Sequence, residues 1–364
     1  MSKILQVKEN GVPIYDIKIE NNYDGFASVL RALKTSGHRI CIVSDTTISK
    51  YYMKEVVEIA KDYSSMVETF TLQPGEEYKN LDSVNRLYEY LIQSKFDRND
   101  FLIALGGGVV GDLTGYVAAT YLRGISFIQM PTTLLSMVDS SIGGKTGVDF
   151  SAYKNMIGAF KQPKAVYINT STLKTLTPRL YHSGFGEVTK YGYIQDKEFD
   201  LWLQEHAEQL LAMDSEALEY MIYRSCDNKR VVVEEDPTEK GIRATLNFGH
   251  TLGHAIEKLM NFELLHGECV SIGMVAAAYM SYKRNMISKE DLDTITATLK
   301  KFSLPVSVTG LDEDAVVETT KNDKKMDAGK IKFILLDGVG HAVIDSTVTR
   351  EEMLDGFRYV AAQN

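Results

Sequence analysis

The sequence is poor in cysteine, and the few cysteines form no recognisable pattern. Its 364 residues include three, Cys41, Cys226 and Cys269, which are scattered along the chain and odd in number. No pair has C-x-x-C spacing, and such a set does not make a disulfide framework. We therefore expect a protein of a reducing compartment without structural disulfides.

Long apolar runs and an excess of basic residues are also missing. No stretch reaches the length of a membrane helix, and the first residues, MSKILQVKENG, contain no apolar signal segment. The net charge is −9 at pH 7, the opposite of the basic excess typical of nucleic-acid-binding proteins. We expect a cytoplasmic protein that binds neither membranes nor nucleic acid. A local basic pocket for an acidic metabolite remains compatible with this charge.

What is present is the pattern of a two-domain enzyme, with 44% hydrophobic and 24% charged residues. A hairpin is expected over residues 1–20, followed by strands in HRICIVSDTT and at 67–72, 101–105, 125–130 and 165–168, with helices between them. This alternation predicts an α/β domain with a mainly parallel sheet over residues 1–173.

The pattern changes after about residue 173, and residues 174–364 are expected to form a mainly helical domain. Helices are predicted at 179–193, 196–212, 214–234, 248–260, 267–286, 288–302 and 350–361, with a hairpin joining 330–336 to 341–344. No repeat, low-complexity tract or linker separates the two parts. The cleft between two such domains is the default place for a site.

A glycine-rich loop follows the strand at 101–105. The run Gly106-Gly-Gly-Val-Val-Gly-Asp112 leads into a helix that we expect to begin near Leu113. Glycine allows close approach of the backbone, and the N–H groups and dipole of a helix N-terminus favour an anion. The run is not G-x-G-x-x-G, but it predicts a pyrophosphate site better than a tight structural turn, which needs fewer glycines.

A second polar segment follows the strand at 125–130. Asp139 precedes the turn that contains Lys145, and Lys154 and Asn155 come shortly after. A lysine is ordinarily a solvated surface charge, but Lys145 is embedded among small residues. We therefore expect these lysines to hold a phosphate or a carboxylate, with Asn155 adding neutral hydrogen bonds.

Three of the seven histidines lie between residues 250 and 266. His250 and His254 are four apart and share a helix face, and His266 follows after a link long enough to turn the chain back. Catalytic zinc takes three protein ligands and keeps one position open, so the spacing favours His250 and His254 with a carboxylate from Glu187 or Glu268. The residues alone do not decide which histidine pair binds.

Basic residues near helix ends and polar turns accompany this cluster. They are Lys190, Lys229, Arg243 and the pair Lys324-Lys325. Together with a metal and a dinucleotide site they indicate a small substrate with several negative charges.

Five segments carry a family resemblance. GGGVVGDLTGY, PTTLLSMVDSSIGGKTGV, KNMIGAF, GFGEVTKYG and NFGHTLGHAIE…LHGE occur in this order over nearly the whole chain. They resemble the corresponding segments of the 3-dehydroquinate synthases, enzymes of the sugar-phosphate cyclase superfamily. The resemblance implies a Rossmann-like NAD-binding domain and a mainly helical metal- and substrate-binding domain.

The resemblance also implies a ligand set for the metal, zinc or alternatively cobalt. The ligands would be Glu187, His250 and His266. His254 would then be a proton-transfer group near the substrate phosphate, since a metal-bound imidazole cannot shuttle a proton. This differs from the set that the spacing alone favours.

The remaining implied roles concern NAD and the substrate. NAD would contact Asp45, Glu76, Lys79, Gly107, Gly108, Val109, Asp112, Thr132, Thr133, Lys145, Lys154 and Thr172, Leu173, Lys174 and Thr175. The substrate would contact Asp139, Lys145, Asn155, Lys190, Lys229, Arg243, Asn247, His254 and a lysine of the Lys324-Lys325 pair, with Arg123 reaching the site of a neighbouring subunit in a homodimer. Catalytic roles would fall to His254, Lys145, Asp139, Asn155 and Glu239, the last at a position that the family assigns to a proton acceptor.

The family's reaction converts 3-deoxy-D-arabino-heptulosonate 7-phosphate to 3-dehydroquinate and phosphate, the second step of the shikimate pathway to chorismate and the aromatic amino acids. It is a lyase reaction with transient oxidation by NAD, phosphate elimination, reduction, ring opening and an aldol closure. Two alternatives are another sugar-phosphate cyclase, such as a 2-deoxy-scyllo-inosose or valiolone synthase, and a metal-dependent polyol dehydrogenase. Arg243 favours a 3-dehydroquinate synthase over other cyclases, because an arginine can bind the carboxylate of the heptulosonate, whereas glucose 6-phosphate has no carboxylate.

Overall fold

The structure is a computed structural model that describes residues 2–151, 153–321, 326–327 and 330–361. Contacts within the chain divide it into two compact units. Unit 1 comprises residues Met1–Leu176 and Leu218–Arg230, and unit 2 comprises Thr177–Ala217 and Val231–Asn364. The first unit is α/β and the second mainly helical, which confirms the predicted fold class. The boundary placed at residue 173 stays a prediction, and no pattern in the sequence indicated that residues 218–230 pack with the first unit.

Unit 1 is built on a seven-stranded sheet in the order β1-β2-β9-β6-β5-β3-β4. All neighbouring strands are parallel except β1 and β2, which form the predicted N-terminal hairpin. The strands are β1 (Lys3–Glu9), β2 (Val12–Glu20), β3 (Arg39–Asp45), β4 (Met66–Leu72), β5 (Phe101–Gly106), β6 (Ser126–Pro131) and β9 (Ala165–Asn169).

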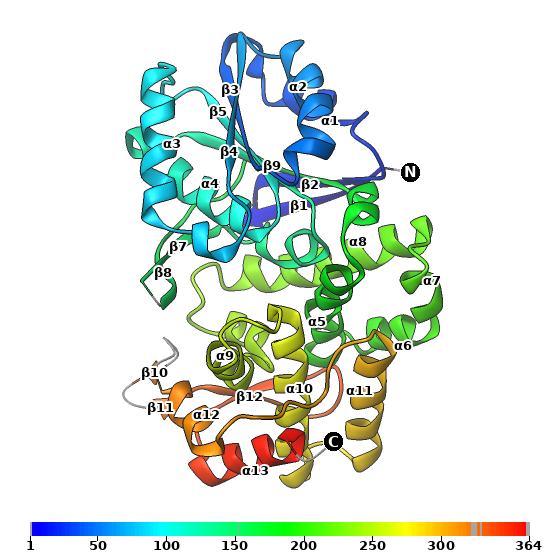
Figure 1. The fold of residues 1–364 in the computed structure, drawn as a ribbon. Helices are drawn as coiled ribbons and strands as arrows, with labels where there is room; N and C mark the ends of the chain where they lie inside the picture. Colours follow the sequence, from blue (N-terminus) through cyan, green and yellow to red (C-terminus); the bar gives the residue numbers. More distant parts are fainter. Residues whose placement is uncertain (1, 152, 322–325, 328–329, 362–364) are drawn as a thin grey trace. The chain divides into compact units, whose positions relative to one another are not determined.

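Helices cover both faces of this sheet (Figure 1). Alternate residues of a strand point to opposite faces, so Ile40 and Ile42 of β3 pack with α1 and α2, while Cys41 and Val43 pack with α3 and α4. The helices are α1 (Phe26–Ala32), α2 (Lys54–Lys61), α3 (Leu81–Gln93) and α4 (Gly108–Thr120). Short helical turns lie at Thr35–Gly37, Ser49–Met53, Glu76–Tyr78, Tyr121–Arg123, Ser136–Ser140 and Thr170–Thr175.

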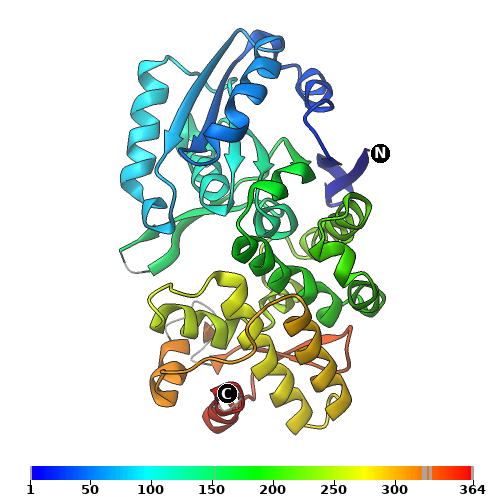
Figure 2. The same ribbon diagram turned by 45° about the vertical axis from the view of Figure 1, so that its right-hand side comes forward.

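Two features of unit 1 differ from the sequence prediction. Helix α4 begins at Gly108, inside the glycine run, and not near Leu113. The segment with Lys145, Lys154 and Asn155, expected as glycine-rich turns, forms an antiparallel hairpin of β7 (Lys145–Phe150) and β8 (Tyr153–Phe160). This hairpin packs against α4 and stands apart from the main sheet in Figure 2.

Unit 2 is mainly helical. Its helices are α5 (Pro178–Ile194), α6 (Lys197–Glu205), α7 (Ala207–Leu211), α9 (His250–Leu259), α10 (His266–Lys283), α11 (Lys289–Lys301), α12 (Glu313–Thr320) and α13 (Arg350–Ala361), with a helical turn at Ile242–Asn247. Helix α8 (Ser215–Glu235) contributes to both units. Small hairpins join β10 (Met326–Asp327) to β11 (Lys330–Ile331) and β12 (Phe333–Leu336) to β13 (Ala342–Asp345).

These elements match the predicted helices within a few residues, with three exceptions. The helix expected over 196–212 is interrupted at His206. Helix α12 was not predicted, and the strand expected over 330–336 is divided between two hairpins. In the described part of the chain, no helix is long and apolar enough to cross a bilayer.

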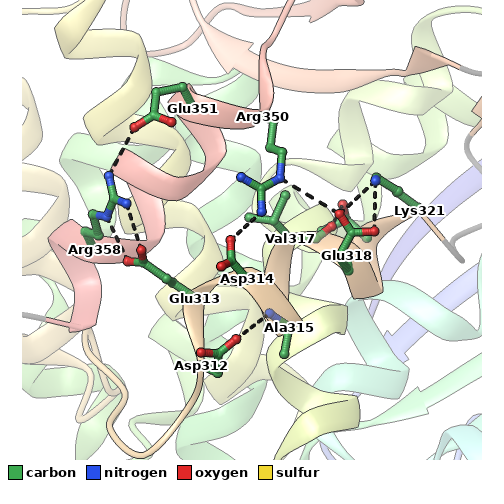
Figure 3. A network of polar contacts seen from close by, with 11 residues as sticks. Asp312, Glu313, Asp314, Ala315, Val317, Glu318, Lys321, Arg350, Glu351 and Arg358 are labelled. Carbon is green, nitrogen blue, oxygen red and sulfur yellow. Dashed lines mark hydrogen bonds and ion pairs between the residues drawn. The ribbon is translucent and has the colours of Figure 1, made fainter.

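Exposed ion pairs connect α12 to α13 (Figure 3). The Arg358 guanidinium donates to both carboxylate oxygens of Glu313 at 2.7 Å, and Arg350 pairs with Asp314. Single exposed pairs contribute about 0–1 kcal/mol each, so the hydrophobic contacts of Val316 and Val317, both fully buried, hold α12 in place.

Candidate functional site

Glycines bring three helices of unit 2 into backbone contact. A Cβ added to Gly267 of α10 would lie 1.8 Å from the carbonyl oxygen of Ser183 in α5, and one on Gly273 of α10 would lie 1.9 Å from that of Gly249, next to α9. No residue other than glycine fits such contacts. Gly267 is next to His266 in the chain, and Gly249 is next to His250. The close packing at the glycines therefore fixes the backbone positions of the two histidines.

Four side chains that can bind a metal meet at this junction. The Oε1 atom of Glu187 lies 3.3 Å from Nε2 of His250 and 3.3 Å from Nε2 of His266. His250, His254 and His266 also offer one ligand atom each within 4.8 Å of one another. The structure therefore brings together both ligand sets considered from the sequence, with His254 beside His250 and His266.

The hydrogen bond of His250 suits a metal ligand. Its Nδ1 lies 3.0 Å from the backbone oxygen of Phe248, which can only accept, so Nδ1 carries the hydrogen. The lone pair is then on Nε2, which faces Glu187. Imidazole and carboxylate donors are those that zinc and cobalt bind, and the fixed tautomer is the usual arrangement around a metal.

The second carboxylate proposed from the sequence has other partners. Glu268 accepts two hydrogen bonds of 2.7 Å from the Arg179 guanidinium and one of 2.7 Å from the Leu265 backbone N–H. These bonds cap the start of α10, where His266 is the first residue. Glu268 thus holds the N-terminus of α10, while Glu187 faces the histidines.

The electrostatics of the cluster favour an ionised carboxylate. Burial alone would raise the pKa of Glu187, but the Lys190 ammonium outweighs it and holds the pKa well below its ordinary value. Burial lowers the pKa of His250 to about 3, which keeps its imidazole neutral. For His266 burial acts in the same direction, but hydrogen bonds to Glu187 and Glu257 outweigh it and raise the pKa to about 9.

The other predicted substrate groups of unit 2 lie in and around α5 and the turn before α9. The ammonium of Lys190 is almost fully buried beside Glu187. Arg243 is only 2% exposed, and its guanidinium donates to the Pro237 carbonyl at 2.7 Å. The Asn247 amide donates to Oε1 of Glu239 at 3.0 Å. Lys324 and Lys325 lie outside the described residues.

In unit 1, most predicted NAD residues follow the carboxyl ends of parallel strands. Asp45 ends β3, Gly107 and Gly108 follow β5, Thr132 and Thr133 follow β6, and Thr172–Thr175 follow β9. These strands are parallel neighbours or next neighbours in one sheet, so their carboxyl ends share an edge. Ligands of open α/β sheets bind at this edge.

The N-terminus of α4 supplies the backbone donors for an anion. The helix begins at Gly108, so Val109 lies in its first turn. A Cβ on Gly107 would lie 3.2 Å from the Thr133 side chain, and one on Gly108 would lie 3.3 Å from Ser140. Glycines here keep room at the helix end, where a phosphate can approach the N–H groups.

A buried lysine, Lys79, contacts three other predicted residues of unit 1. Nζ of Lys79 lies 2.7 Å from Oδ2 of Asp112, 2.6 Å from Oδ1 of Asn155 and 3.7 Å from Oε1 of Glu76. Burial alone would lower the pKa of Lys79, but the Asp112 and Glu76 carboxylates outweigh it and raise the pKa. The sequence analysis missed Asp149, which accepts the Asn155 backbone N–H at 2.7 Å; nothing in the local pattern marks it.

The rest of the predicted residues of unit 1 are placed as follows. Lys229 is buried and donates to the Asp139 carboxylate at 2.7 Å. Lys145 and Lys174 are exposed, and Lys154 is half-buried. Arg123 is exposed and has φ +67°, after Leu122 with φ +49°. Two successive non-glycine residues in the left-handed region are strained, which favours a functional reason for this turn.

Comparison with known proteins places the chain in a family. Residues 69–183 match the family model described as 3-dehydroquinate synthase N-terminal, and residues 184–326 match the model 3-dehydroquinate synthase C-terminal. A 3-dehydroquinate synthase of Acetivibrio thermocellus is 45% identical over 96% of either chain.

Solved structures of similar fold include two enzymes that bind NAD+ and a divalent metal. A 2-epi-5-epi-valiolone synthase from Streptomyces hygroscopicus, with NAD+ and Zn2+ bound, has a TM-score of 0.88 at 25% identity and covers 96% of this chain and 97% of that one. A 2-deoxy-scyllo-inosose synthase with carbaglucose-6-phosphate, NAD+ and Co2+ has a TM-score of 0.87 at 24% identity, covering 98% and 100%.

Proposed function

Because this chain belongs to the 3-dehydroquinate synthase family, we propose that it converts 3-deoxy-D-arabino-heptulosonate 7-phosphate to 3-dehydroquinate and phosphate. The observation that carries the proposal is the buried Arg243. It lies seven residues before His250, the first of the three histidines that could bind a metal. Arginine binds a carboxylate through two parallel hydrogen bonds, and this substrate, unlike glucose 6-phosphate, has a carboxylate.

The proposal includes NAD and one divalent metal, as in the cyclases of similar fold. The predicted ligands Glu187, His250 and His266 fit zinc or cobalt by donor type, and His250 also by its tautomer. When bound, the metal would supply Lewis-acid polarisation of a substrate oxygen, and NAD would supply reversible hydride acceptance.

The residues of the chain then have positioning and proton-transfer roles. Arg243 would bind the substrate carboxylate, and Lys190 would donate to a substrate hydroxyl close to the metal ligands. His254 would hold or move a proton beside the leaving phosphate. In unit 1, the Asp139–Lys229 ion pair would orient a substrate hydroxyl, since its carboxylate is fixed by a buried ammonium.

A coupled assay tests the reaction. We expect purified protein with zinc and NAD to release phosphate from the heptulosonate phosphate, with no accumulation of NADH. Turnover of glucose 6-phosphate alone would identify a 2-deoxy-scyllo-inosose synthase instead. NADH formed in step with product would identify a polyol dehydrogenase.

The ligand set is tested by two substitutions. We expect His254→Ala to keep zinc but to lower kcat by about 10²–10⁴-fold, the usual contribution of a general acid or base. Glu187→Gln should weaken zinc binding by more than the roughly 10–100-fold that changes outside the ligand shell cost. Zinc content after dialysis and the visible spectrum of the cobalt form measure both. Zinc loss in His254→Ala would instead restore the set that helical spacing favours, in which His250 and His254 are both ligands.

The substrate role of the basic residues predicts loss of activity without loss of stability. Lys145→Ala removes an exposed side chain, and such changes usually alter the free energy of unfolding by at most about 0.5 kcal/mol. Arg243→Lys keeps the charge but not the paired donors. We expect either variant to lose roughly 10- to 150-fold in kcat/KM, equivalent to about 1.5–3 kcal/mol per charged hydrogen bond. Equal falls in melting temperature and activity would indicate structural roles.

We also propose a cytoplasmic homodimer in which Arg123 completes the partner's site. Arg123→Ala and Lys145→Ala would each have low residual activity alone. If Arg123 acts in the partner, co-expressed chains form mixed dimers with one intact site, and activity rises to about a quarter of the wild-type value. If Arg123 acts within its own chain, the mixture stays at the low activity of the single variants.

A further inference from the structure

A carboxylate outside the predicted site organises the loop that carries two of its residues. Helix α8 ends at Glu235, and Asp236 is the first residue after it. The carboxylate of Asp236 accepts three backbone N–H groups, from Lys240 at 2.9 Å, Gly241 at 2.7 Å and Arg243 at 3.1 Å. The local signal in the sequence is DPTEKG, in which an aspartate precedes proline and glycine in a turn.

These bonds determine where Arg243 lies. Its backbone N–H is held by Oδ2 of Asp236, and its guanidinium donates to the Pro237 carbonyl at 2.7 Å. The arginine is therefore tied to the start of the loop at both its main chain and its side chain. A guanidinium held in this way loses less conformational freedom when it binds a carboxylate.

The same loop contains Glu239 in a constrained conformation. Its φ is +58°, in the left-handed region that costs a non-glycine residue about 1–3 kcal/mol. Asn247 donates to its carboxylate at 3.0 Å. Surrounding contacts have to maintain such a conformation, and the bonds from Asp236 to Lys240 and Gly241 fix the residues that follow Glu239 directly.

We infer that Asp236 is a positioning residue, which holds the loop 237–243 so that Arg243 and Glu239 are preorganised for a substrate carboxylate and its neighbouring atoms. The inference rests on the proposed function for the identity of that substrate. The pKa of Asp236 supports it, because burial opposes ionisation but the three backbone bonds and Arg243 hold the pKa below its ordinary value.

Asp236→Ala and Asp236→Asn test the inference. Alanine removes all three acceptors. Asparagine keeps the shape and one acceptor oxygen but turns an amide nitrogen toward backbone donors. We expect both to raise KM for the heptulosonate phosphate by about 10- to 100-fold, with less than threefold change in kcat. Zinc content should not change, because no metal ligand is touched.

A matched control lies at the other end of α8. Asp214 caps that end by accepting the Ala217 backbone N–H at 2.9 Å. Asp214→Ala therefore removes a comparable carboxylate–backbone contact from the same helix. We expect it to lower the melting temperature without changing KM. If Asp236→Ala lowers stability and leaves KM unchanged, as the control does, Asp236 is only structural and the inference is wrong.

Hydrogen exchange separates this inference from the proposed reaction. In the wild-type protein we expect protection of the amides of Lys240, Gly241 and Arg243, and loss of that protection in Asp236→Ala but not in Asp214→Ala. This outcome requires no turnover. If the wild-type protein does not use the heptulosonate phosphate but the protection pattern holds, the reaction is wrong and the loop role stands. Fast exchange of these amides in the wild-type protein would overturn the loop role itself.

Discussion

Gly267→Ala is expected to destroy the proposed metal site. The added methyl group would lie 1.8 Å from the Ser183 carbonyl oxygen, so α5 and α10 have to move apart by an ångström or more. Glu187 is on α5 and His266 is the first residue of α10, and their 3.3 Å separation cannot survive this movement. We expect zinc affinity to fall by more than about 100-fold, beyond the cost of changes outside the ligand shell.

Two further glycine substitutions control this experiment. Gly37→Ala adds a methyl group with no atom within 4 Å and should leave zinc binding and melting temperature unchanged. Gly186→Ala places a methyl group 2.5 Å from the Gly267 carbonyl oxygen, at the same helix contact. It should reproduce the loss in milder form and keeps the test open if Gly267→Ala does not fold. Wild-type zinc affinity in a folded Gly267→Ala protein would show that the helix contact does not set the ligand geometry.

The parallel sheet and most helices were predictable because their patterns are local. Strand β5 is a continuous apolar run that is buried along its whole length, as expected for a strand covered on both faces. The hairpin β1–β2 was confirmed because alternation and a turn lie in consecutive residues. These signals require no knowledge of distant parts of the chain.

The β7–β8 hairpin was missed because its glycines are required by contacts between the two strands and not by turns. Gly147 and Gly158 are cross-strand partners. A Cβ on Gly147 would lie 2.7 Å from the Ile157 carbonyl oxygen, and one on Gly158 would lie 2.5 Å from that of Thr146. From sequence alone, glycines beside lysine and asparagine indicate turns. Here they permit a close approach of two strands.

The predicted start of α4, near Leu113, was wrong for a related reason. Glycine is a poor helix former, so the helix was expected only after the glycine run. In the structure, Gly111 and Gly115 are inside α4. A Cβ on Gly115 would lie 2.4 Å from the Thr146 side chain, and one on Gly111 would lie 2.8 Å from the end of the Gln129 side chain. Tertiary packing outweighs intrinsic propensity here, and the helix therefore begins inside the glycine run.

The residues of the proposed metal site were easier to find in the sequence than to divide into ligands and other roles. Helical spacing identified His250 and His254 as neighbours, but Glu187 is 63 positions before His250 and no local pattern connects them. The tautomer of His250 depends on the Phe248 carbonyl, and the role of Glu268 depends on Arg179. Such contacts exist only in the folded chain, so the family resemblance supplied a ligand set that periodicity could not.

Lys79→Met is expected to have the second large effect, on unit 1. The substitution keeps the volume of the buried side chain but removes the charge that faces Asp112, 2.7 Å away. It also removes a hydrogen bond to Asn155. Breaking a buried ion pair by losing one partner typically costs about 3–5 kcal/mol, because the other charge stays buried without compensation. Such a loss is a large fraction of the about 5–15 kcal/mol by which a domain is typically stable.

A double-mutant cycle shows whether the cost comes from the pair. Lys79→Met with Asp112→Leu removes both charges, and replacing a buried pair by apolar groups is often neutral. We expect the double variant to recover most of the unfolding free energy lost in Lys79→Met. NAD affinity should stay low in both, because Lys79 and Asp112 are both expected to contact NAD. If the double variant is no more stable than Lys79→Met, the ion pair does not hold this part of the fold. If it also binds NAD normally, the network belongs to the fold alone, and the NAD site lies elsewhere along the carboxyl edge of the sheet.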